Sequence, residues 1–308
     1  MTMKRDGCNL EVRACRPEEL PNVIEQLDQE FVFGKQRTLS LSTRFPPALS
    51  AANVEQIRVA VSDEVICGAL ATKEFDWVVG REQCAWRGAM VGMVWVDSQF
   101  RGIGIGSNLL LSVTRLLHEI RADFGVLWTG IPTFYERAGW FLGDSDLFGE
   151  AIDRPASAHI DAVVCRPLVS MEATWLEHLR VAQLPMYVIR NALDYCAVPI
   201  PASHVLCFCI QKGDGNEGFA LVGEQDGTGY FYEMVAPPIL WGSLWSAVRQ
   251  HFDRLFVNGH SGDGFAEWLA KNRFVAWRPQ KRSMWLRISG RSEGQCFDAW
   301  HIPYFDRI

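Results

Sequence analysis

The stretch VWVDSQFRGIGIGSNLL, residues 94–110, constrains the fold of this chain more than any other segment. Its apolar start predicts a strand that ends near Val96, and the Leu-rich run after the glycines predicts a helix. Between them, Gly102, Gly104 and Gly106 allow a sharp turn and leave backbone N–H groups without a Cβ in front of them. The first N–H groups of a helix have no partner within it and, with the helix dipole, they favour an anion. The segment therefore predicts a phosphate-binding unit of strand, turn and helix.

Several kinds of protein bind phosphate with such a turn, and the residues around the glycines separate them. A P-loop places a Lys directly after its last glycine, and this turn has none. A dinucleotide fingerprint, G-x-G-x-x-G, needs a third glycine where this chain has Leu109. The pattern R-x-x-G-x-G is met by Arg101, Gly104 and Gly106. With an apolar strand before it and a Leu-rich helix after it, the segment resembles the acetyl-CoA motif of the GNAT (GCN5-related) N-acetyltransferase superfamily.

A second stretch, PTFYERAGW at residues 132–140, carries the same resemblance. An aromatic-Tyr pair, which ends at Tyr135, precedes a Gly-aromatic pair, and this is similar to the later helix of GNAT enzymes. In that superfamily the Tyr at this place often sits beside the CoA sulfur and protonates the departing thiolate. The resemblance, which covers roughly residues 10–150, implies that Tyr135 is the general acid. A buried structural tyrosine is the plainer interpretation of the same residue.

The resemblance also implies acetyl-CoA as the cosubstrate, in chemistry that needs neither a metal nor a covalent enzyme intermediate. The glycine-rich turn would cradle the pyrophosphate, and the end of the preceding strand would bond to the pantetheine arm. The implied cofactor contacts are Val94, Trp95, Val96, Arg101, Gly102, Ile103, Gly104, Ile105, Gly106 and Ser107. A backbone N–H near the strand end would stabilise the charge that develops on the thioester carbonyl oxygen. A turn without any ligand is the competing interpretation of the glycines.

The general base is the part of this chemistry that the sequence does not supply. A lysine-like amine has a pKa of about 10.4 and must lose a proton before it attacks a thioester. The strand predicted over 84–96 carries no Glu or His near its end. Glu74 and Asp76 share one face of the preceding strand, and Glu233 has a similar place in the second half. For each of the three, a solvated or paired acid is the plainer interpretation.

A length of 308 residues predicts two domains, and the second half repeats the order of elements predicted for the first. The expected fold class is α/β (α+β), with two GNAT-like domains over 1–158 and 159–308, each a mixed, mostly antiparallel sheet flanked by helices. In the second half, the run Ala236-Pro237-Pro238 stands where the phosphate loop would fall, and proline has no N–H to offer. We therefore expect a degenerate second domain that lacks the loop, packs against the first domain and walls the acceptor site.

The composition of the chain limits the classes of molecule that it is expected to bind. A net charge of −6 without basic runs argues against nucleic acid, and no apolar stretch reaches the 18 residues of a membrane span. The nine cysteines are scattered without C-x-x-C pairs, so neither a zinc framework nor a disulfide scaffold is expected. This pattern, with an N-terminus that lacks the apolar core of a signal peptide, predicts a cytoplasmic protein. The aromatic tail over 297–308 is expected to dock on the body of the protein.

The function that follows is transfer of an acetyl group from acetyl-CoA to an amine by direct attack. The acceptor is expected to be a small-molecule or peptide amine. The alternative is a non-catalytic acyl-CoA sensor or regulatory module, in which the loop is kept and Tyr135 is dispensable. The identity of the amine, the length of the acyl chain and the oligomeric state stay open at this point.

Overall fold

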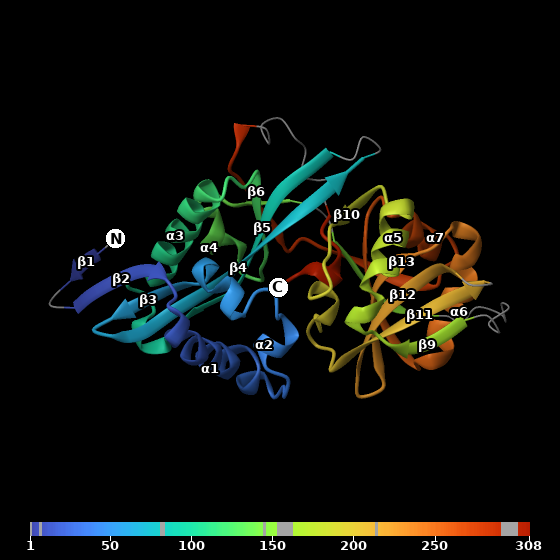
Figure 1. The fold of residues 1–308 in the computed structure, drawn as a ribbon, viewed down its shortest axis with the longest axis horizontal. Helices are drawn as coiled ribbons and strands as arrows, with labels where there is room; N and C mark the ends of the chain where they lie inside the picture. Colours follow the sequence, from blue (N-terminus) through green and yellow to red (C-terminus); the bar gives the residue numbers. More distant parts are fainter. Residues whose placement is uncertain are drawn as a thin grey trace.

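The computed structural model describes residues 2–5, 8–80, 84–143, 146–152, 163–212, 215–290 and 301–308. Two lobes lie side by side, each built on a mixed sheet flanked by helices, and the chain ends between them (Figure 1). The predicted fold class is therefore confirmed. None of the helices in these ranges is both long and apolar enough to cross a membrane.

The first sheet has the strand order β1-β2-β3-β4-β5-β6-β16-β7, and β10 pairs with the end of β4. Its strands are β1 (Thr2–Arg5), β2 (Cys8–Ala14), β3 (Arg58–Ser62), β4 (Val65–Val79), β5 (Cys84–Val96), β6 (Phe124–Trp128), β7 (Phe141–Leu142), β10 (Met186–Val188) and β16 (Ser283–Arg287). Its helices are α1 (Leu20–Phe31), α2 (Leu41–Arg44), α3 (Ile105–Glu119) and α4 (Pro132–Glu136). β3 and β4 form a hairpin: Asp63 and Glu64 join them with φ of 47° and 69°, the left-handed values of a tight hairpin turn.

The two faces of this sheet are covered by different helices. Along β3, Val59 faces the core beneath α1, which contributes Val23 and Leu27, while Ala60 faces the opposite core. That second core is filled by α3, whose buried side chains are Leu109, Leu110, Val113, Leu116 and Leu117. These residues recur at the spacing of a helix, and they lie in or directly after the Leu-rich run that predicts it. The strand alternation and the helical period therefore place the glycine-rich turn at one end of the sheet, where α3 begins.

The second sheet has the order β15-β8-β14-β13-β12-β11-β9. Its strands are β8 (Asp146–Ala151), β9 (Val163–Pro167), β11 (His204–Lys212), β12 (Gly215–Gln225), β13 (Thr228–Val235), β14 (Arg254–His260) and β15 (Val275–Gln280). Its helices are α5 (Ala173–Gln183), α6 (Pro238–His251) and α7 (Gly264–Lys271). The succession β11-β12-β13-α6-β14-α7-β15 repeats β3-β4-β5-α3-β6-α4-β7, and the parallel pairs β13–β14 and β5–β6 occupy the same place.

The two sheets exchange strands. β8 comes from the first half of the sequence but lies between β14 and β15, and β16 comes from the second half but lies between β6 and β7. The pairing is extensive, because β16 bonds to β6 from Ser283↔Trp128 to Arg287↔Phe124. The predicted boundary between 158 and 159 lies outside the described residues and stays a prediction.

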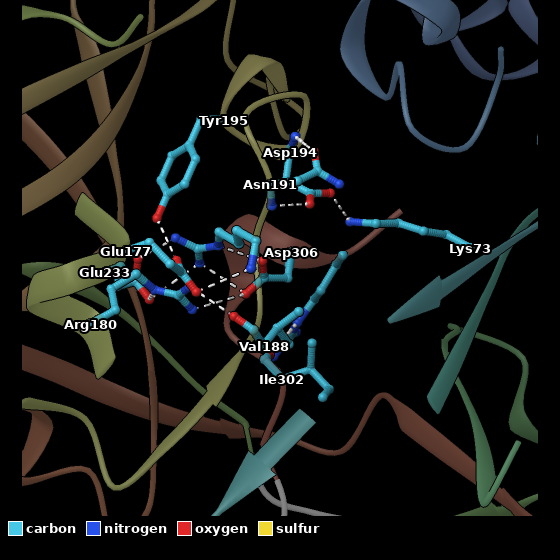
Figure 2. Close-up of polar contacts among 12 residues, drawn as sticks. Lys73, Glu177, Arg180, Val188, Asn191, Asp194, Tyr195, Glu233, Ile302 and Asp306 are labelled. Carbon is cyan, nitrogen blue, oxygen red and sulfur yellow. Dashed lines mark hydrogen bonds and ion pairs between the residues drawn. The ribbon is translucent and has the colours of Figure 1, made fainter. Parts of the chain in front are cut away.

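A buried cluster of charges, which we call the charge clamp, holds the end of the chain against the second lobe (Figure 2). Arg190 donates to Asp306 at 2.6 and 2.9 Å and to Glu233 at 2.7 and 3.2 Å. Arg180 reaches Glu233 at 3.2 Å. Beside this cluster, Lys73 of β4 pairs with Asp194 at 2.7 Å, which ties the connecting segment to the first lobe.

The charge clamp fixes the tail that the sequence predicts to dock. Ile302 and Phe305 are each only 1% exposed, and the described part of the tail therefore confirms that prediction. The rest of the predicted segment, 297–300, lies outside the described residues. At the far end, the backbone of Ile308 lies so close to β5 that a Cβ on Gly92 would meet its carbonyl oxygen at 2.7 Å. The tail therefore forms a wall at the junction of the lobes.

Candidate functional site

The turn between β5 and α3 has the backbone that its glycines suggest. Gly102 and Gly104 have φ of 82° and 91°, a left-handed conformation that costs other L-residues roughly 1–2 kcal/mol. A Cβ at either glycine would meet no other heavy atom within 4 Å, so the space in front of the turn is open. Gly104 is also the N-cap residue of α3. The turn therefore presents open backbone at the start of a helix.

The first N–H groups of α3 are available to a ligand. The N–H of Asn108 donates to the Gly104 carbonyl at 3.0 Å and closes the first helical turn. The N–H groups of Ile105, Gly106 and Ser107 come before it, and by helix geometry they have no acceptor within the helix. Together with the positive end of the helix dipole, they can hold a diphosphate.

Arg101 braces this turn. Its Nε donates to the Val96 carbonyl at 2.9 Å, and its Nη2 lies 3.4 Å from a carboxylate oxygen of Glu30. The side chain remains 56% exposed, so the guanidinium also adds positive charge beside the open backbone. The bond to Val96 ties the end of the strand to the turn that follows it.

The end of β5 is separated from the regular sheet in two ways. The parallel pairing of β5 with β6 ends at Met90↔Val126, although both strands continue beyond that pair. On the other side, the β4–β5 register jumps between Ala71↔Gly92 and Ala69↔Trp95, which makes a β-bulge, and Met93 there has a left-handed φ of 56°. A bulge leaves a residue out of the ladder, so a backbone amide near Val94 can face a ligand instead of a strand.

A cavity of about 620 Å³ lies at this strand end, within the usual range of small-molecule sites. We call it the cofactor pocket. All of the predicted cofactor residues except Ile103 line it: Val94, Trp95, Val96, Arg101, Gly102, Gly104, Ile105, Gly106 and Ser107. Ile103 is absent from the lining, and its side chain is 51% exposed. The pocket is also lined by six residues that the sequence did not indicate: Glu30, Phe31, Phe100, Ile131, Phe134 and Arg137.

Tyr135 lies in the same pocket, on α4, and is 7% exposed. The neighbouring ring of Phe134 packs against the first turn of α3, where a Cβ on Gly106 would approach it to 2.9 Å. The two rings meet edge to face with centroids 4.9 Å apart, which fixes the position of Tyr135. Burial raises the pKa of the Tyr135 phenol, and a hydrogen bond with Thr129 offsets part of that rise. The phenol is therefore protonated at neutral pH and can donate a proton.

The acids considered as a general base lie elsewhere. Glu74 accepts from Arg87 at 2.5 Å and from Gln56 at 2.5 Å, and Asp76 is exposed. Glu233 belongs to the charge clamp. None of these three acids lines the cofactor pocket, and the role of any of them as the general base stays a hypothesis.

A second cavity, of about 280 Å³, lies where the two lobes meet. We call it the junction pocket. It shares Phe31 with the cofactor pocket, and its lining includes Met93, directly before Val94 on the bulge. Tyr304, Arg307 and Ile308 of the docked tail also line it. The two pockets therefore meet at the bulged strand. In the described ranges, no group of three or more His, Cys, Asp and Glu residues is placed to hold a metal ion.

Comparison with known proteins agrees with this architecture. Residues 11–143 match the acetyltransferase (GNAT) domain family. A conserved protein of unknown function from Enterococcus faecalis superposes with a TM-score of 0.72 at 14% identity, over 91% of this chain and 73% of that one. A GCN5-related N-acetyltransferase from Anabaena variabilis gives 0.71 at 15% identity, over 91% and 73%. One from Kribbella flavida gives 0.66 at 16% identity, over 90% and 71%. No curated protein matches this sequence.

Proposed function

Because this chain belongs to the GNAT superfamily through residues 11–143, we propose that it is an N-acyltransferase that moves an acetyl group from acetyl-CoA to an amine. The observation that carries this proposal is the composition of the cofactor pocket. It brings together the open N–H groups at the start of α3, the bulged end of β5 and the phenol of Tyr135. A diphosphate, a pantetheine arm and a thioester sulfur need these three features in that order.

The proposed reaction is a direct transfer. The nitrogen of a neutral amine attacks the thioester carbonyl carbon, and negative charge develops on the carbonyl oxygen. A backbone N–H at the bulge beside Val94 stabilises that charge without reorganising. The carbon–sulfur bond then breaks and Tyr135 protonates the CoA thiolate. The proton that the attacking nitrogen loses passes through water to the tyrosinate, which restores the phenol. The products are an amide and free CoA.

We propose that the second half, 159–308, takes no cofactor of its own. β13 ends at Val235, and α6 begins at Pro238 after Ala236 and Pro237. The turn lacks glycines, and its prolines remove the N–H groups that a diphosphate needs. This half instead provides Asn258 and Gly259 to the junction pocket, which supports a role as a wall of the acceptor site.

We also propose a cytoplasmic location, which rests on the thiols. Within the described residues, Cys15, Cys165, Cys196, Cys207 and Cys209 are free thiols. Free thiols are typical of a reducing compartment, where acetyl-CoA would also have to be available.

The substitution Gly104→Glu tests the cofactor site. It places a carboxylate in front of the N–H groups of α3 and forces a side chain onto a left-handed backbone. We expect the Kd for acetyl-CoA to rise at least about tenfold, because the added charge repels the diphosphate and backbone strain of about 1–2 kcal/mol distorts the turn. Isothermal titration calorimetry measures the change.

Gly227→Glu is the matched control for that experiment. Gly227 also has a left-handed φ, 75°, and open space in front of it, but it lies in the hairpin between β12 and β13. This variant should bind acetyl-CoA as the wild type does. Unchanged binding by Gly104→Glu would contradict the proposed function. If the wild-type protein binds acetyl-CoA tightly but releases CoA with none of the amines, the acyl-CoA sensor is favoured instead.

A further inference from the structure

The junction pocket combines an apolar interior with an excess of positive charge. Its walls include Phe31, Leu41, Phe45, Met93, Trp128 and Ile200, which offer aromatic and aliphatic surface. The charged side chains that line it are Arg37, Arg282, Arg307 and Asp146. Guanidinium groups therefore outnumber carboxylates in a pocket that adjoins the proposed acetyl-transfer site.

The one side-chain carboxylate in this lining is already engaged. Asp146 accepts two hydrogen bonds from Arg307, at 2.7 and 2.8 Å, and lies 3.3 Å from His301. Burial alone would raise the pKa of Asp146, but Arg307 and His301 outweigh it and hold the pKa well below its usual range. Asp146 is thus an anion that neutralises Arg307, and the pair adds little net charge to the pocket.

Arg37 and Arg282 are not neutralised in this way. Arg37 donates to the Phe31 carbonyl at 3.0 Å, and within the described ranges it forms no ion pair. In the same ranges the Arg282 side chain has neither a hydrogen bond nor an ion pair. Both guanidinium groups act on the phenol of Tyr304: burial raises its pKa, while Arg307, Arg282 and Arg37 oppose the rise. Two uncompensated positive charges therefore lie around the Tyr304 side of the pocket.

From this arrangement we infer that the acceptor is a small primary amine that also carries a carboxylate on an apolar body. The inference rests on the proposed function and specifies its substrate class. The carboxylate would bind Arg282, with Arg37 contributing, and guanidinium groups suit carboxylates because they can donate two parallel hydrogen bonds. The apolar body would lie against the aromatic walls. The amine would then point toward Met93 and the bulge, where the thioester is expected.

The same charges bear on the missing general base. Positive groups near an amine disfavour its protonated form and lower its pKa. With one substrate carboxylate bound, the charges of the side chains that line the pocket still sum to a positive value. An amino acid therefore becomes easier to deprotonate there, whereas a polyamine or another multiply charged cation is repelled. A cavity of about 280 Å³ also favours a small molecule over a folded protein.

The test compares phenylalanine with phenethylamine, which has the same aromatic body and amine but lacks the carboxylate. Release of CoA from acetyl-CoA measures kcat/KM for both, with spermidine as a cationic amine without a carboxylate. We expect phenylalanine to be used at least about tenfold better than phenethylamine and spermidine. Arg282→Gln should lower kcat/KM for phenylalanine by about ten- to hundredfold, the range for losing a hydrogen bond between charged groups, and should thereby reduce the preference for phenylalanine over phenethylamine.

Arg254→Gln is the control, because Arg254 lies on β14 in an exposed pair with Glu150 and does not line either pocket. It should leave the preference for phenylalanine intact. Equal or better use of phenethylamine or spermidine would overturn the inference while the proposed function stands. A preference that survives Arg282→Gln would overturn it as well. Failure of acetyl-CoA to bind, or of every amine to be acetylated, would instead remove the proposed function on which the inference rests.

Discussion

Replacing Tyr135 by Phe is expected to lower kcat by about 10²–10⁴-fold, the usual contribution of a positioned general acid. The phenol is buried in the cofactor pocket and fixed by the edge-to-face contact with Phe134. Removing only the hydroxyl leaves that ring contact in place, so the Kd for acetyl-CoA should change less than about threefold. The CoA thiolate would then have to leave without a proton from the protein. Steady-state rates of CoA release, together with calorimetry of acetyl-CoA, measure both quantities.

Tyr187→Phe is the matched control for this substitution. Tyr187 is also buried, at 5% exposure, but it lies on β10 and lines neither pocket. Loss of the Tyr187 hydroxyl should leave kcat within about twofold of the wild type. Because burial raises the pKa of Tyr135 above 10, the wild-type kcat should not fall on the alkaline side before about pH 10. Full activity of Tyr135→Phe would show that another group, or water, protonates the thiolate.

Replacing Asp306 by Ala is expected to reduce the free energy of unfolding by about 3–5 kcal/mol, the usual cost of removing one partner from a buried ion pair. Asp306 is 4% exposed and holds both Nε and Nη2 of Arg190. Without it, Glu233 would be left to face the Arg190 guanidinium, while Arg180 would keep its bonds to Glu233 and Glu177. The docked tail should be destabilised as well, because the centroid of the Phe305 ring lies 4.6 Å from the Arg190 Cζ. Urea denaturation followed by fluorescence measures the change.

Glu150→Ala supplies the contrast, because Glu150 pairs with Arg254 at the surface and such pairs contribute about 0–1 kcal/mol. The pH dependence gives a second check. Burial alone would raise the pKa of Asp306, but Arg190 and Arg180 hold it below its usual range. Its contribution is therefore present above about pH 4, the unfolded pKa, and is lost as the pH falls through the folded pKa. A difference in the free energy of unfolding between wild type and Asp306→Ala that stays constant down to pH 2 would contradict this assignment.

The sequence predicts local structure well where one segment contains the whole signal. The alternating glycines predict the turn before α3, and the apolar stripe from Leu109 to Leu117 predicts the face that this helix buries. The run of polar residues at Asp63-Glu64 predicts the first hairpin for the same reason. Each of these features depends on residues that are neighbours in the chain, so backbone preference and periodicity are sufficient to find them.

Contacts between distant segments could not be predicted in this way. The run Met284-Trp285-Leu286 is fully apolar, but nothing in it indicates that it bonds to β6 of the other half. The junction pocket could not be predicted for the same reason, because Phe31 and Tyr304 line it together only after the lobes have packed. The acids considered as a base were assessed by their place on a strand, and their pairing with Arg87 or Arg190 depends on other elements. The position of an acidic residue along a strand therefore says little about whether it acts as a general base.

The exchange of strands has a consequence for how the protein can be divided. β6 and β7 have β16 between them, and β14 and β15 have β8 between them, so each sheet is completed by the other half of the sequence. A polypeptide cut at its midpoint would leave both fragments with an open gap inside a sheet, where buried backbone groups would lose their partners. The half of the chain that carries the cofactor pocket is therefore not expected to fold by itself. The two halves should unfold together in one cooperative transition. A fragment of the first half placed in another protein would need Ser283–Arg287 as well.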